Sequence, residues 1–208
     1  MATITPNYSW PVPTSGDLVK DGATAIEALG DAIDATVFAN SPGLSFVSKN
    51  TFSSVATYTL PTNTFTSTYE NYRVIIQAKS TTANQNASVR LVTSGTPNSG
   101  AIYNKQHLDV YGGTANAAQY NGQTSLSDLF VVSNGVECYT TFDIFSPQLA
   151  TYTGISCIQN NNSSATASQL RLQVYNTTVT TVFDSLYLFP NTSGNITGYV
   201  TVYGYKKS

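Results

Sequence analysis

The chain has 208 residues, of which 10% are charged and 12% are aromatic, and its formal net charge is −2. Its nine scattered Lys and Arg residues argue against nucleic-acid binding, and no apolar run reaches the ~20 residues that a transmembrane helix needs. The N-terminus lacks the basic region and apolar stretch of a signal peptide, and one His with two Cys is too few for an ordinary zinc site. The abundance of Thr, Ser, Tyr and Phe is typical of an all-β protein with few ionic side chains.

Residues 1–16 are predicted to form an extended arm, because three prolines restrict this segment to extended or polyproline conformations. Such an arm cannot bury the rings of Tyr8 and Trp10 by itself. Tyr8, Trp10, Pro11 and Pro13 are therefore candidate docking residues for another protein or for a sister subunit. The alternative is a frayed terminus without a function.

Residues 17–40 carry a helical pattern, in which apolar residues recur at alternating steps of three and four, the spacing of a coiled-coil seam. Gly22 and Gly30 weaken this helix, so it needs a partner, either its own β domain or identical helices in a bundle. We favour the bundle, because the Pro42-Gly43 turn separates the helix from everything that follows. The predicted oligomerisation residues are Val19, Ile26, Leu29, Ile33 and Val37.

Residues 44–208 are predicted to form a head domain of antiparallel strands. Apolar and polar residues alternate, as in 169–175, where Leu170, Leu172 and Val174 share one face. Turn clusters separate the strands without intervening helices or repeats, which favours a β-sandwich. The fold class is therefore mainly β: an extended arm and a short α-helix, followed by a jelly-roll-like antiparallel β-sandwich. The predicted strands are 44–49, 55–60, 71–79, 87–93, 107–111, 128–133, 136–145, 151–158, 169–175, 181–188 and 197–205.

Two stretches rich in Gly, Asn or Ser are predicted to be exposed. The longer one, 94–125, is predicted to form long loops that carry Tyr103, Tyr111 and Tyr120, which are candidate contacts with a receptor or with a neighbouring subunit. Aromatic rings stack on sugar faces and amides bond sugar hydroxyls, so a glycan is the expected receptor. The shorter stretch, 160–164, is predicted to be the tip of a hairpin.

The N-terminal segment contains the runs WPVP (10–13), DLVKDGA (17–23) and IEALGDAID (26–34), and the strand-like run 198–206 lies close to the end of the chain. The N-terminal runs resemble the N-terminal segment of tailed-phage minor structural and fibre proteins. The segment 65–73 and the run 198–206 are similar to an early strand and the last strand of the β-sandwich heads of those proteins. The resemblance implies a virion-docking arm over 1–16, an oligomerisation helix over 17–40, and location in the virion after assembly in the bacterial cytoplasm.

Three functions remain open. The first is a homotrimeric fibre subunit that docks on other virion proteins through its arm and binds host-surface glycan; the resemblance implies three chains, although Ile and Leu at successive seam positions favour two. The second is a capsid decoration, cement or head-fibre (knob) protein that grips the shell with the same arm. The third is a polysaccharide depolymerase, although the spacing of the carboxylates selects no catalytic pair and the lone His107 receives no role. We predict a non-enzymatic protein without catalytic residues, metal, cofactor, nucleic acid or membrane insertion.

The two cysteines are predicted to face each other across a hairpin. If 136–145 and 151–158 close around 146–149, then Cys138 lies opposite Cys157 on the core face, within reach of a disulfide. Because the resemblance places folding in a reducing cytoplasm, we expect two buried free thiols instead.

Overall fold

The computed structural model describes residues 3–14, 18, 21–40, 43–111, 113–164 and 167–206. Val19, one of the predicted oligomerisation residues, lies outside them. The chain divides into two compact units, Met1–Gly43 and Leu44–Lys207. The division falls directly after the Pro-Gly pair in the sequence.

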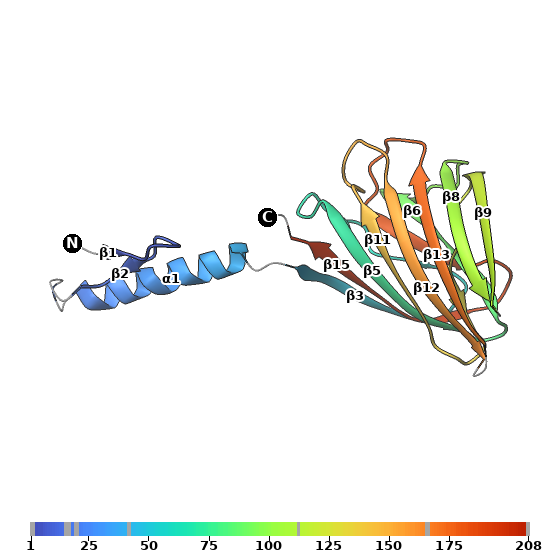
Figure 1. Ribbon diagram of the computed structural model, residues 1–208, viewed down its shortest axis with the longest axis horizontal. Coiled ribbons are helices and arrows are strands. Elements are labelled where there is room, and N and C mark those ends of the chain that lie inside the picture. Colours follow the sequence, from blue (N-terminus) through green and yellow to red (C-terminus); the bar gives the residue numbers. More distant parts are fainter. Residues whose placement is uncertain are drawn as a thin grey trace. The chain divides into compact units, whose positions relative to one another are not determined.

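The described residues of the N-terminal unit form a small hairpin and one helix, drawn in blue in Figure 1. Strand β1 (Thr3–Ile4) pairs antiparallel with β2 (Pro11–Val12), and helix α1 spans Gly22–Asn40. The described part of the predicted arm is therefore folded back on itself, and the prediction of an extended segment is wrong. A turn over residues 6–8 reverses the chain, and the backbone N–H of Ser9 donates to the carbonyl of Thr5 at 3.0 Å.

The aromatic residues of this hairpin have partners within the unit. The indole Nε1 of Trp10 donates a hydrogen bond of 2.8 Å to Thr36 Oγ1 on α1, and the Tyr8 ring stacks on the Trp10 ring at a centroid distance of 5.2 Å. The hairpin thus covers one side of the helix. Tyr8 nevertheless remains more than half exposed, so one face of its ring is open.

Helix α1 carries apolar residues on a second side as well. Leu29 and Thr36, seven residues apart, lie on the partly buried side, whereas Ile26 and Val37 are 66% and 59% exposed. Ile26, Ile33 and Val37 follow one another at spacings of seven and four, so they share one face of the helix. The predicted seam is therefore divided between the hairpin side and a second face, here called the open face of α1 (Ile26, Ile33 and Val37), on which Ile26 and Val37 are exposed and Ile33 is half-buried.

The C-terminal unit is an antiparallel β-sandwich, as the sequence predicted (Figure 1). One sheet has the order β3-β15-β5-β11-β12-β13-β8-β9, and the other has the order β10-β6-β14-β4, with β7 paired to β6. The strands are β3 (Leu44–Val55), β4 (Tyr58–Thr59), β5 (Asn71–Ser80), β6 (Gln85–Thr93), β7 (Thr96–Pro97), β8 (Tyr103–Tyr111), β9 (Thr114–Gln123), β10 (Leu126–Val132), β11 (Cys138–Phe145), β12 (Gly154–Ser164), β13 (Ala167–Thr177), β14 (Ser185–Pro190) and β15 (Ile196–Tyr205).

The core lies between the two sheets and is built from alternate residues of their inner faces. In β5, Tyr72, Val74 and Ile76 are buried, while the residues between them are partly exposed. Packing is close enough in β15 to require a glycine, because a Cβ atom at Gly204 would overlap the ring of Tyr69.

Two predictions for the head domain are wrong. Residues 94–125 are not long loops, because they form β7, β8 and β9, and β8 pairs with β9 from Tyr103–Gln123 to Tyr111–Thr114. Residues 160–164 are not a hairpin tip, because they continue β12, and the connection to β13 falls on residues outside the described ones. In both places the hydrogen-bonded ladder with a neighbouring strand outweighs the weak strand propensity of Asn, Gln and Gly.

Candidate functional site

The three tyrosines predicted to form a contact surface have different environments. Tyr103 is buried in the core, where its hydroxyl donates to the carbonyl of Asn98 at 3.0 Å and accepts from the N–H of Leu91 at 3.1 Å. Burial raises the pKa of Tyr103 to about 12. The prediction that Tyr103 is a surface contact is therefore wrong. The side chain of Tyr111 lies outside the described residues.

Tyr120 is the one of the three whose described side chain reaches solvent. It is 46% exposed on β9 and stacks on His107 of β8 at a centroid distance of 5.7 Å. The pKa of His107 is lowered, first by burial and next by the nearby charge of Lys105, which favours the neutral imidazole. Tyr120 and His107 together offer a flat, uncharged surface at this end of the sheet.

Next to Tyr120 and His107, polar side chains of the eight-stranded sheet form hydrogen bonds with β10, the edge strand of the five-stranded sheet. Strand β10 pairs only with β6 among the described strands, and its register shifts between Leu126 and Phe130, with Asp128 at a positive φ of 58°. An edge strand with a bulge leaves backbone carbonyls without ladder partners. The carbonyls of residues 127, 128 and 129 accept hydrogen bonds from side chains instead.

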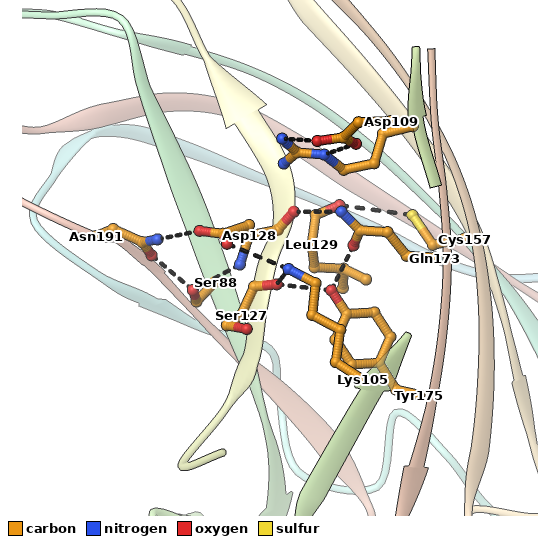
Figure 2. A network of polar contacts seen from close by, with 11 residues as sticks. Ser88, Lys105, Asp109, Ser127, Asp128, Leu129, Cys157, Gln173, Tyr175 and Asn191 are labelled. Carbon is orange, nitrogen blue, oxygen red and sulfur yellow. Dashed lines mark hydrogen bonds and ion pairs between the residues drawn. The ribbon is translucent and has the colours of Figure 1, made fainter. Parts of the chain in front are cut away.

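Figure 2 shows these side chains converging on β10 from β8, β12 and β13. We call this set the β10 clasp. Its hydrogen bonds are Lys105 Nζ to Ser127 O at 2.9 Å, Tyr175 Oη to Ser127 O at 2.7 Å, Gln173 Nε2 to Asp128 O at 3.0 Å and Cys157 Sγ to Leu129 O at 3.5 Å. The clasp therefore satisfies buried backbone groups that the bulge would otherwise leave unpaired.

Charges within the clasp are paired. Lys105 Nζ lies 3.2 Å from Asp128 Oδ2, and the Lys105 side chain is 2% exposed while that of Asp128 is 31% exposed. Burial lowers the pKa of Lys105, and the charge of Asp128 opposes this effect. Close by, Arg171 of β13 forms a bidentate ion pair with Asp109 of β8. The charges of the clasp are thus used in holding strands together, which favours a structural role for it.

The two cysteines are buried and not bonded to each other. Their predicted register is wrong: Cys157 lies opposite Phe142, and Cys138 lies opposite Ala78 of β5. The reason is that the connection between β11 and β12 runs over residues 146–153, so that Phe145 faces Gly154. Burial raises the pKa of Cys157 to about 12.

The face of the eight-stranded sheet that points away from the five-stranded sheet is apolar over β8, β12 and β13. Leu172 of β13 lies between Ile158 of β12 and Leu108 of β8 in one cross-strand row. We call this region the outer-face patch. Its members are 38–60% exposed: Leu108, Val110, Ile158, Leu170, Leu172 and Val174. Several of them line a concavity of about 510 Å³.

The charged residues beside the patch on the same face are also paired. Arg73 of β5 forms a hydrogen-bonded ion pair with Asp143 of β11 at 2.8 Å, and the Tyr205 hydroxyl donates to the same carboxylate. Lys79 lies 3.0 Å from Glu137. This part of the outer face therefore carries no net charge.

No protein-family model matches the chain, and no curated protein is significantly similar to it. Over the described ranges, no helix combines the length and hydropathy needed to cross a membrane. In that same part of the chain, no three His, Cys, Asp or Glu side chains gather as a metal site would require. The candidate functional regions described above are the open face of α1, the outer-face patch, and the ring of Tyr120.

Proposed function

We propose that the protein is a non-enzymatic structural subunit of a tailed-phage virion, a homotrimeric fibre whose N-terminal unit attaches it to the particle. The open face of α1 carries this proposal. Ile26 and Val37 are more than half exposed although their spacing is that of a helix-packing seam. Apolar residues in such a row are stabilised when identical helices pack along them, and the resemblance of residues 10–34 to phage structural proteins supplies the context.

We further propose that the β-sandwich faces outward and contacts host-surface glycan. Tyr120 supports this part of the proposal, because a half-exposed ring backed by His107 can stack on the apolar face of a sugar. Strand β9, which carries Tyr120, contains Asn and Gln residues and no charged residue, so it can bond sugar hydroxyls without salt-sensitive contacts.

A capsid decoration or head-fibre (knob) protein is the second candidate. The observation that favours it is the short distance along the chain between the two units: α1 ends at Asn40 and β3 begins at Leu44. A fibre with a long shaft would need more chain between its anchor and its head, whereas a knob on the shell would not.

The two candidates differ in where the protein lies on the particle. Antibody against the chain, applied to particles of the phage that encodes it, should label the tail or baseplate in negative-stain images. Label spread over the capsid would replace the fibre with the decoration protein, and absence of label from intact and disrupted particles would refute both.

The attachment role of the N-terminal unit has its own test. A chain lacking residues 1–40 should fold, because the sandwich has its own core, but should not be incorporated into particles. Incorporation of the truncated chain at the level of the full chain would show that the anchor lies elsewhere.

A further inference from the structure

The outer-face patch is unusual because two of its strands, β13 and β8, place aliphatic side chains on the outer face and polar side chains on the inner face. In β13, Leu170, Leu172 and Val174 face outward, while Arg171, Gln173 and Tyr175 face the interior. A strand with one solvated face normally places its apolar residues inside. Here both faces of β13 are suited to burial. The polar side chains of the inner face form hydrogen bonds within the clasp, and the side chains of the outer face are aliphatic.

Strand β8 repeats the same inversion next to it. Leu108 and Val110 face outward, while Lys105, His107 and Asp109 face inward. Figure 1 shows β12, β13 and β8 as neighbours in the sheet, so their outward residues form one continuous surface. Two adjacent strands with this pattern indicate a face that is covered in the assembled protein.

We propose that the outer-face patch packs against the same face of a second copy of this chain, so that the heads are joined as well as the helices. This inference rests on the proposed function in one respect, since it takes the assembly to be made of identical chains. A patch that packs on the identical patch of one other copy makes a two-fold contact, whereas in the proposed trimer the three patches face the three-fold axis and meet around it.

Electrostatics favours a second copy over a charged partner. The patch itself contains no ionisable residue, and the nearby charges are paired within the chain as Arg73 with Asp143 and Lys79 with Glu137. A charged partner would find no free charge here to complement its own. A copy of the same neutral surface requires none.

The size of the patch suits an interface as well. Six aliphatic side chains exposed by 38–60% leave on the order of 400 Å² of apolar surface, which is within the range of the largest apolar patch on a typical monomer, and such patches are often functional. That is about half of the roughly 800 Å² that each partner contributes to a standard interface. Residues beside the patch, such as the half-exposed Tyr139 of β11, can supply part of the rest.

Assembly through α1 would strengthen this contact. Because α1 ends at Asn40 and β3 begins at Leu44, joining the helices would hold the heads at a high local concentration. A sheet-to-sheet contact that is weak between free heads can then be formed in the assembled protein.

The test is the dissociation concentration of the full chain, measured by sedimentation velocity over a dilution series. Ile158→Lys with Leu172→Lys places two charges in the centre of the patch and should raise this concentration roughly tenfold or more relative to the parent. Val136→Lys with Val182→Lys is the matched control, because both valines are exposed outside the patch; it should change the value less than about twofold.

Far-UV circular dichroism checks that each variant is folded, and Ile158→Thr with Leu172→Thr, which keeps strand propensity, replaces the lysine variant if that one does not fold. Unchanged dissociation in both patch variants would overturn the inference, as would a parent chain that is monomeric throughout the series. If only Ile26→Asp with Ile33→Asp weakens assembly, the helix contact stands and the head contact fails. If the patch variant dissociates but particles carry no label, the head contact stands and the virion proposal fails.

Discussion

Asp128→Asn should destabilise the sandwich far more than its position near the surface would indicate. Asp128 is 31% exposed, but its partner Lys105 is 2% exposed and has one other described acceptor, the carbonyl of Ser127. Removing the carboxylate leaves a buried ammonium without a counter-charge, a change that costs about 3–5 kcal/mol when one partner of a buried pair is lost. Because Ser127 still accepts from Lys105, we expect about 3 kcal/mol, at the lower end of that range. Asparagine tolerates the positive φ at this position, so the backbone should not add to the loss.

Urea unfolding followed by far-UV circular dichroism, at one protein concentration, measures the effect. Glu137→Gln is the control: it breaks the pair with Lys79, whose partners are 37% and 36% exposed, and should cost less than about 1 kcal/mol. Combining Lys105→Met with Asp128→Asn removes the unpaired charge, so the double variant should be more stable than Asp128→Asn alone.

The same variant has a pH signature. The pKa of Lys105 is already lowered from 10.5 by burial, and loss of Asp128 should lower it further. The unfolded chain then binds more protons than the folded chain, so the penalty is full below the folded pKa and shrinks as pH rises through it toward 10.5. A loss in Asp128→Asn no larger than in Glu137→Gln, or a double variant less stable than Asp128→Asn, would refute the role assigned to the clasp.

Three further predictions concern single residues. Gly204→Ala places a Cβ atom in the space of the Tyr69 ring and should lower the free energy of unfolding in urea by about 1–3 kcal/mol. An unchanged free energy of unfolding would show that the Tyr69 ring moves aside freely. Burial raises the pKa of Asp143, but hydrogen bonds from Arg73 and Tyr205 outweigh this effect and lower the pKa below its ordinary value of 3.8. In urea unfolding, Asp143→Asn should therefore be less stable than the parent above pH 3.8. The difference should vanish as pH falls through the pKa of the folded protein. The thiol of Cys157, whose pKa is about 12, should not react with Ellman's reagent at pH 8 until the protein is unfolded, and rapid reaction of the native protein would contradict its burial.

Alternation of apolar and polar residues was enough to predict the mainly β fold. In β5, Tyr72, Val74 and Ile76 occupy alternate positions, which places them on one face of a strand, and the structure buries them together. The pattern works there because the strand lies in the middle of the large sheet, where its inner face contacts the core. Local periodicity and burial then agree.

The same pattern gives no indication of which face of β13 is inside. Its aliphatic face is the outer one, and Arg171, Gln173 and Tyr175 face inward because they meet Asp109 and the β10 bulge. Those partners come from 45 to 62 residues away in the chain, so no window of sequence contains them. Long-range hydrogen bonding reverses what polarity alone would favour.

The predictions of an extended arm and of the cysteine register were wrong for two separate reasons. Three prolines are compatible with a tight turn as well as with an extended chain, and the contact between Trp10 and Thr36 spans 26 residues. The register of the hairpin depends on the length of its connection, and residues that resemble the start of β12 at 151–153 belong to that connection. Of the tyrosines predicted in the Gly- and Asn-rich segment, Tyr120 is exposed and Tyr103 is buried, so the composition of the segment does not distinguish an exposed ring from a core ring.

The mass of the full chain in solution, measured by light scattering coupled to size-exclusion chromatography, tests the proposed self-assembly most directly. The account predicts about three times the subunit mass of 22.2 kDa, and a smaller mass for Ile26→Asp with Ile33→Asp, which places charges on the open face of α1. A mass of one subunit for the parent chain at every concentration would contradict the assembly through α1 and through the outer-face patch alike.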